Sequence, residues 1–219
     1  MTVDNEMPRL QAALVDDSSA IRVGLPVLVP QADFVSIHSS VESFLEAAPE
    51  VDLVMLDLKL SDGLNPVIEG GQAIQQVARR GYPICLYTDE RRRLVLAQCI
   101  RLGALGIVHK ADPADVVWDA MQRIAAGEPV VTQSLVGLAE LIDRRGGLPT
   151  LTGRQRQVLN ARARGEPWAR VAQSLYITEG VAREHLDAAV AKFAEFLTVS
   201  TPAELAHHLG VADGDLLAE

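Results

Sequence analysis

Short runs of Val, Ile and Leu alternate with longer segments of helical periodicity through the first part of the chain. Apolar runs of this kind, bounded by turn residues, are typical of buried parallel strands. We predict strands at residues 10–15, 33–37, 51–56, 83–87 and 104–108, and helices at residues 19–29, 41–48, 70–80, 91–102 and 113–126. The alternation predicts an α/β fold, a doubly wound five-stranded parallel sheet covered by helices.

The last part of the chain, from about Thr150, has no strand pattern and predicts a small all-α domain. Thr152 and Thr178 suit helix N-caps because a hydroxyl oxygen accepts a backbone N–H there. Helices are expected at residues 153–164, 167–175, 179–196 and 203–209, with a three-residue turn at 176–178. Two helices joined by such a turn within a small bundle indicate a helix-turn-helix. A short helix near 132–143 and a hinge at 144–149 separate the two parts.

The helix predicted after the turn has one apolar and one charged face. Residues at helical spacing predict its buried face: Ala182, Leu186, Ala189, Val190 and Phe193. The opposite face carries Glu179, Arg183, Glu184 and Asp187. Trp168, at the start of the preceding helix, is expected to pack against the hinge or the first domain, with an exposed position as the alternative.

Charged or hydroxylated residues follow four of the predicted strands. They are Asp16 and Asp17, Asp57, Thr88, and, one residue later, Lys110. Because the carboxyl ends of parallel strands share one edge of a sheet, we expect these side chains to converge there. Clustered carboxylates repel each other unless a cation is present, and Mg²⁺ accepts both carboxylate and phosphate oxygens. The set therefore predicts a site for a divalent cation and a phosphoryl group.

Composition and charge exclude several classes of protein. Neither a signal peptide at the start nor an apolar run long enough to cross a membrane is found, so we expect a cytoplasmic location. Cys85 and Cys99 lack metal-ligand spacing and are expected to be reduced core residues.

The net charge is −9, and neither half is basic: residues 1–147 hold 13 Lys and Arg against 20 Asp and Glu, and residues 148–219 hold 7 against 9. The net negative charge therefore argues against strong nonspecific binding to nucleic acid.

The strand-end residues resemble a known pattern when they are taken together. Val15–Arg22, Leu56–Leu58, Tyr87–Thr88 and Val108–Lys110 resemble receiver domains of two-component response regulators, which have a flavodoxin-like fold. The resemblance implies that Asp57 accepts a phosphoryl group from a sensor histidine kinase. It also implies that Asp16, Asp17, Asp57 and the backbone carbonyl of Lys59 hold Mg²⁺. Thr88 and Lys110 are then expected to sense the phosphoryl group.

The second part resembles the LuxR-type helix-turn-helix. The likeness rests on Leu151–Leu159, Ala163–Gly165, Val171–Ala172, Ile177–Thr178 and His185. Together the two halves resemble response regulators of the NarL/FixJ class, which bind DNA as dimers. The expected DNA-contacting residues are Thr178, Arg183, Glu184 and Asp187. The implied organisation is a receiver at 8–127, a linker with a short helix at 128–149, the helix-turn-helix at 150–210 and a tail at 211–219.

Three departures from the receiver pattern leave a second hypothesis open. Ile107 occupies the switch position, where an aromatic residue is usual, and Asp89 replaces a small residue after Thr88. The segment after Asp57 carries an insertion around residues 62–66. The favoured function is a DNA-binding transcriptional regulator, not an enzyme, controlled by Mg²⁺-dependent phosphorylation of Asp57. The alternative is a regulator that works without phosphorylation, through dimerisation or a protein partner, and binds DNA weakly.

Overall fold

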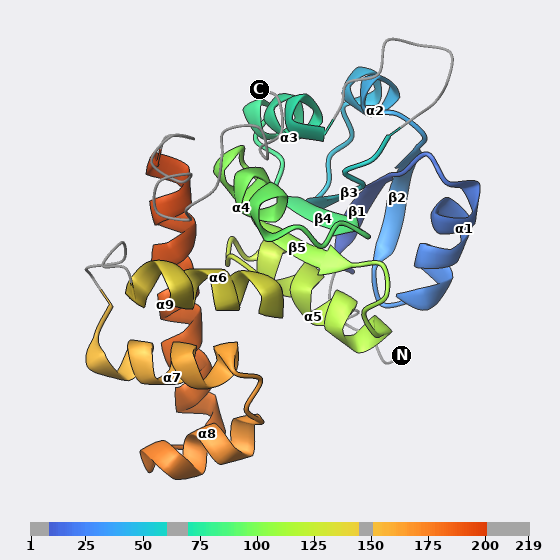
Figure 1. Cartoon of the computed structure of the whole chain (residues 1–219). Coiled ribbons are helices and arrows are strands. Elements are labelled where there is room, and N and C mark those ends of the chain that lie inside the picture. Colours follow the sequence, from blue (N-terminus) through green and yellow to red (C-terminus); the bar gives the residue numbers. More distant parts are fainter. Residues whose placement is uncertain (1–8, 61–69, 145–150, 201–219) are drawn as a thin grey trace, which may run out of the picture. The chain divides into compact units, whose positions relative to one another are not determined.

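Five parallel strands form a single sheet in the computed structural model, which describes residues 9–60, 70–144 and 151–200 (Figure 1). The strands are β1 (Gln11–Val15), β2 (Asp33–His38), β3 (Leu53–Leu56), β4 (Ile84–Thr88) and β5 (Gly106–His109), in the order β2-β1-β3-β4-β5. The central strands β3 and β4 are fully buried, and β1 is buried beyond Gln11, as their continuous apolar runs predict, because helices cover both faces of the sheet. The predicted fold class is confirmed.

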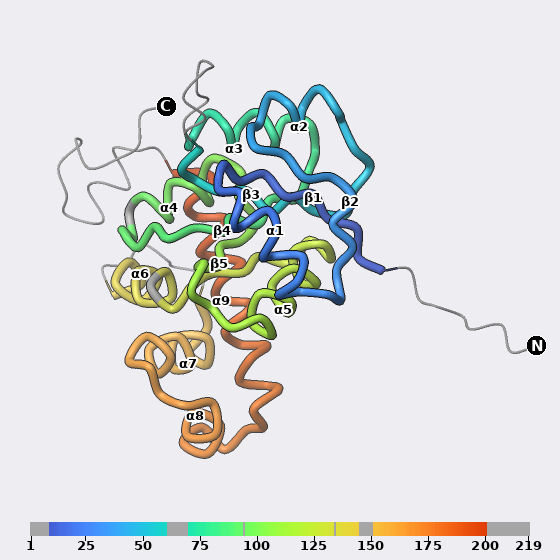
Figure 2. The backbone as a smooth tube through the Cα atoms, turned by 90° about the vertical axis from the view of Figure 1, so that its right-hand side faces the viewer, coloured from blue at the N-terminus to red at the C-terminus, as the bar shows by residue number. Residues whose placement is uncertain are grey.

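The helices around the sheet are α1 (Ser19–Leu28), α2 (Val41–Ala47), α3 (Gly70–Arg79) and α5 (Ala114–Ala125). Figure 2 shows α2 and α3 on one side of the sheet and α1 and α5 on the other. The amphipathic pattern of α5 explains its position, since Val117, Ala120, Met121 and Ile124 are all buried. By its internal contacts this unit comprises Met1–Asp89 and Ala104–Gly127.

The second compact unit is helical in its described residues, which are 90–103, 128–144 and 151–200. Its described helices are α4 (Arg93–Arg101), α6 (Gln133–Arg144), α7 (Gly153–Ala163), α8 (Trp168–Leu175) and α9 (Glu179–Val199). Helix α7 contacts α6, α8 and α9. The core of the α7–α9 bundle is a cluster of small and branched side chains, namely Val158, Ala161, Val171 and Ala182.

Both predicted threonine caps are present in this bundle. The Thr152 hydroxyl accepts the Gln155 backbone N–H, and the Gln155 side chain accepts the Thr152 N–H in return at 2.9 Å. The Thr178 hydroxyl accepts the Val181 N–H at 3.2 Å. Helix α8 ends at Tyr176, which has a left-handed backbone and turns the chain toward α9. Local side-chain chemistry thus sets the helix-turn-helix boundaries.

The predicted buried face of α9 is confirmed, and the helix is longer than predicted. Ala182, Ala189, Val190 and Phe193 are buried, while Leu186 is partly buried against the bundle core. The helix continues past residue 196 because Leu197, one turn beyond Phe193, is also fully buried. The predicted helix at 203–209 and the insertion at 62–66 lie outside the described residues. Within the described part of the chain, no helix has the length and apolar character to cross a bilayer.

Candidate functional site

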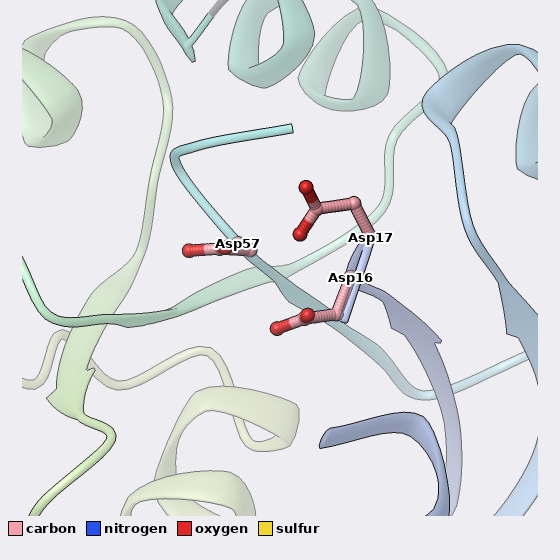
Figure 3. Close-up of side chains that lie close together, drawn as sticks. All are labelled: Asp16, Asp17 and Asp57. Atoms are coloured by element: carbon pink, nitrogen blue, oxygen red, sulfur yellow. The ribbon is translucent and has the colours of Figure 1, made fainter. Parts of the chain in front are cut away.

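Three carboxylates meet at the carboxyl edge of the sheet. Asp16 and Asp17 directly follow β1, and Asp57 directly follows β3. The two strands are hydrogen-bonded neighbours in register, so their ends lie side by side. One carboxylate oxygen from each residue lies within 4.8 Å of the other two, and Figure 3 shows the three side chains gathered around one point. The structure therefore brings these predicted residues together.

The backbone of the Asp16–Asp17 loop is held by contacts that sequence reasoning did not assign. The Ser18 N–H donates to Asp16 Oδ1 at 2.8 Å. One guanidinium nitrogen of Arg22, in α1, donates to the backbone carbonyls of both Asp16 and Asp17, each at 2.8 Å. The position of Arg22, near the start of the helix that follows the two acids, is the signal that points to this role. These contacts fix the direction in which the two carboxylates project.

Lys110 neutralises part of this cluster. Its ammonium lies 2.8 Å from Asp16 Oδ2 and 2.9 Å from Asp57 Oδ2. Burial raises the pKa of Asp57 above its ordinary value, although the hydrogen bond and charge of Lys110 oppose this rise. Burial also acts to lower the pKa of Lys110, but its bonds to Asp16 and Asp57 outweigh burial and raise that pKa. The lysine therefore stays charged and remains tied to both acids.

The donor set fits a small divalent cation. Asp16 is fully buried and Asp57 is 5% exposed, so their negative charges are costly without compensation. Lys110 supplies one positive charge against three carboxylates, which leaves a net negative pocket lined by hard oxygen atoms. Such oxygens are the ligands that Mg²⁺ and Ca²⁺ prefer. The Lys59 backbone N–H donates to Asp57, which lowers the Asp57 pKa slightly against the effect of burial.

Thr88 and Ile107 lie on the neighbouring strands. Thr88 ends β4 and is fully buried, and its carbonyl accepts the Lys110 N–H at 3.1 Å. Thr88 and Lys110 therefore occupy adjacent positions on the same sheet edge as the acids. Ile107 is buried within β5 and pairs with Leu86 of β4. Its role as a switch position stays a prediction.

Glu90 carries a buried charge. It is only 6% exposed, whereas the neighbouring Asp89 is exposed. The Glu90 carboxylate accepts the backbone N–H groups of Arg91 and Arg92, and it pairs with the Arg92 guanidinium at 2.7 Å. These bonds lower the Glu90 pKa to about 2. Helix α4 begins at Arg93, later than predicted, after an extended Arg92.

The expected DNA-contacting residues lie at the start of α9. Arg183 and Glu184 are exposed, Asp187 is half-buried, and Arg183 lies 3.7 Å from Glu179 in an ion pair. Thr178 is the N-cap of the helix. Trp168 packs partly buried against the core of its own bundle, which excludes the fully exposed alternative, and its predicted contact with the hinge or the first domain stays a prediction.

Arginines elsewhere in the bundle have partners within it. Arg156 Nε lies 2.9 Å from both carboxylate oxygens of Asp143, which places this side chain against α6. Arg164 pairs with Glu166 at 2.8 Å. The positive charge of these two arginines is therefore partly neutralised by acidic residues of the same bundle.

Comparison with known proteins gives a consistent set of relatives. No family model matches the chain. The response regulator RamR of Streptomyces coelicolor is 29% identical over 85% of this chain and 90% of its own. The transcriptional regulatory protein FixJ of Rhizobium meliloti is 27% identical over 82% of this chain and 86% of its own. A solved structure of the RcsB response regulator of Salmonella typhimurium covers 93% of this chain and 99% of its own, with a TM-score of 0.54 and 19% identity.

The acidic pocket on a five-stranded parallel sheet, followed by a helix-turn-helix, is the arrangement expected of a two-part response regulator. The relatives specify the class further, since proteins of both the NarL and FixJ types match across most of the chain. The chain is similar to response regulators of the NarL/FixJ class across most of its length.

The Glu90 bonds predict a specific dependence of α4 stability on pH. We expect Glu90→Gln to lower the free energy of opening of the first turn of α4 by about 1–2 kcal/mol at pH 7. Because the folded pKa lies below the ordinary value of 4.5, the stabilisation is fully present above pH 4.5 and is lost as pH falls through about 2. Amide hydrogen exchange of full-length wild type and variant, from pH 7 downward, measures this difference.

Asp89→Asn is the matched control, since it removes the neighbouring exposed charge. It is expected to change the opening free energy by less than about 0.5 kcal/mol. Equal effects of the two substitutions, or a Glu90→Gln effect that is constant down to low pH, would contradict the assignment.

Proposed function

We propose that this chain is a transcriptional response regulator that binds DNA under the control of Mg²⁺-dependent phosphorylation of Asp57. The observation that carries the proposal is the buried Asp57 carboxylate, held 2.9 Å from Lys110 beside Asp16 and Asp17. A carboxylate in this setting has the parts that phosphoryl transfer requires, namely a nucleophile, an anchored cation and a cluster of metal ligands. The similar RamR and FixJ proteins are named as regulators, and this supports the proposal.

The chemistry is a direct transfer to Asp57. A carboxylate oxygen of Asp57 attacks the phosphorus of a phosphohistidine on a sensor kinase. The P–N bond breaks, and its electron pair returns to the imidazole, which leaves an acyl phosphate on Asp57. Mg²⁺, held by Asp16, Asp17, Asp57 and the Lys59 carbonyl, would neutralise charge on the phosphoryl oxygens. Lys110 then pairs with a phosphoryl oxygen in place of the Asp57 carboxylate, and the Thr88 hydroxyl donates to another.

The output of the proposed switch is binding of DNA by the helix-turn-helix. Helix α9 follows the turn and is the expected recognition helix, with Thr178, Arg183, Glu184 and Asp187 toward the DNA. A solved complex of the structurally similar RcsB with DNA supports a DNA-binding output. Carboxylates near phosphates reduce affinity, so Glu184 and Asp187 favour weak binding by a single copy. Two copies bound side by side on paired half-sites would offset this weakness.

One observation favours a second candidate function. The buried Ile107 at the switch position cannot make the hydrogen bond of a tyrosine, and the exposed Asp89 adds a negative charge beside Thr88. Both features would weaken the response to a phosphoryl group. In this second function the regulator works without phosphorylation, through dimerisation or a protein partner.

A phosphodonor experiment separates the two functions. Full-length protein incubated with acetyl phosphate and Mg²⁺ is expected to gain the mass of one phosphoryl group, as measured by intact-mass spectrometry. Omission of Mg²⁺ or the substitution Asp57→Asn should abolish the gain, because the nucleophile or the neutralising cation is missing. Asp52→Asn, which removes an exposed acid at the other end of β3, is the matched control and should retain it. A folded wild type that gains no mass would support the second function, and an adduct that survives in Asp57→Asn would exclude Asp57 as the acceptor.

The acidic residues on α9 predict an unusual response of DNA affinity to substitution. Glu184→Gln and Asp187→Asn are each expected to raise affinity for a duplex of about 30 base pairs by roughly threefold, because each removes repulsion from phosphates. Fluorescence anisotropy at several salt concentrations measures the change. Glu195→Gln, exposed farther along the same helix, is the control and should leave the affinity unchanged. Binding that is absent at low salt, or that does not weaken as salt rises, would contradict a DNA-binding output.

A further inference from the structure

Trp168 contacts two arginines that come from two other helices of the bundle. It is the first residue of α8, and its side chain packs partly buried against the cluster of Val158, Ala161, Val171 and Ala182. The guanidinium carbon of Arg162, in α7, lies 4.5 Å from the centroid of the Trp168 ring. The guanidinium carbon of Arg183, in α9, lies at the same distance of 4.5 Å. We call these three residues the Arg–Trp–Arg cluster.

The ring attracts both cations, while the cations repel each other. An indole face is the strongest aromatic partner for a guanidinium, since its electron density is negative above the ring. Burial lowers the pKa of Arg162, and the nearby charge of Arg183 lowers it further. Glu179 offsets part of the charge, through its 3.7 Å pair with Arg183. The cluster therefore holds positive charge in an arrangement that an additional anion would stabilise.

The geometry also fixes the two arginines to different degrees. Arg162 is half-buried, and it donates to the backbone carbonyl of Glu166. Its other terminal nitrogen lies 3.4 Å from the side-chain oxygen of Gln133. Arg183 is exposed on the first turns of α9, beside the Thr178 cap. A fixed cation next to an exposed one, both against a rigid ring, suits a phosphate group, which accepts hydrogen bonds from planar guanidinium groups.

We propose that Trp168 is a positioning residue that holds Arg162 and Arg183 as a paired contact for a phosphate of the DNA backbone. The inference rests on the proposed DNA-binding function and specifies how a net-negative helix-turn-helix performs it. The Arg–Trp–Arg cluster supplies the sequence-independent contact that orients α9 on the duplex. Glu184 and Asp187 then lie on a helix whose position on the duplex is already set. Their repulsion of phosphates disfavours other positions of α9 along the DNA.

The test replaces the ring while it keeps the apolar packing. Trp168→Leu is expected to weaken binding to a fluorescein-labelled duplex of about 30 base pairs by roughly fivefold. It should also reduce the slope of log affinity against log salt concentration by about 1, since one phosphate contact is lost. Trp168→Phe keeps a ring with a weaker attraction for cations and should fall between wild type and Trp168→Leu. Circular dichroism melting of each full-length variant shows whether the bundle remains folded.

A double-mutant cycle separates positioning from a purely structural role. Because Trp168 acts through Arg183 as well as Arg162, the combination of Trp168→Leu with Arg183→Gln should cost less affinity than the sum of the two single changes. Arg170→Gln is the matched control, since it removes an exposed arginine of α8, and its effect should add to that of Trp168→Leu. In the free protein, the ring should shift the side-chain Hε signals of Arg162 and Arg183 upfield in NMR spectra, and Trp168→Leu should remove the shifts.

Each outcome decides between the claims. If wild type binds DNA while Trp168→Leu changes neither affinity nor salt slope, the positioning role is wrong and the proposed function stands. If wild type fails to bind DNA at low salt, the proposed function fails and the inference fails with it. If Trp168→Leu does not fold, Trp168→Phe and the NMR shifts of the wild type decide, and absence of the shifts overturns the proposal. Additive losses in the Trp168–Arg183 cycle would overturn it as well.

Discussion

The ammonium of Lys110, placed between the buried carboxylates of Asp16 and Asp57, is the contact on which the candidate site depends. Three acids within 4.8 Å would repel each other strongly in a partly desolvated pocket. Lys110 offsets part of this repulsion, and Arg22 and Ser18 hold the backbone of the loop that carries two of the acids. The remaining negative charge makes the pocket receptive to a cation. In the proposed function, Lys110 transfers its pairing from a carboxylate to a phosphoryl oxygen without losing a negatively charged partner.

The same physical principle recurs in the helical unit with the signs reversed. Arg162 and Arg183 are like charges held near one another by the Trp168 ring, as the acids are held near one another by Lys110. Holding like charges together costs free energy in the unbound protein and is repaid when a ligand of opposite charge binds. One site is thus suited to a cation with a phosphoryl group, and the other to a phosphate. Glu90 differs from both, because its charge is satisfied within the chain by two backbone amides and Arg92.

The sheet and its edge could be predicted from the sequence because parallel strands impose strong local rules. Buried strands require continuous apolar runs, and the parallel topology places the residues after β1, β3 and β4 at one edge. Asp57 and Lys110 lie far apart in the chain, and their proximity could be predicted only because parallel strands end at a shared edge of the sheet. The other contacts depend on side-chain packing and orientation, which local patterns do not encode. The packing of Trp168 against its own bundle core and the bonds of Glu90 to two backbone amides are contacts of this kind. The extension of α9 beyond residue 196 accompanies the burial of Leu197.

The most direct test of the central claim is fluorine NMR of the full-length protein with beryllium fluoride, the phosphomimetic used with the isolated receiver domain of RcsB. The claim is that Asp57, once released by Lys110, accepts a phosphoryl group beside a metal held by the three acids. It predicts bound fluorine resonances in the presence of Mg²⁺ that disappear without the metal and in Asp57→Asn. Bound resonances that persist in Asp57→Asn, or a folded wild-type protein that shows none, would contradict the claim.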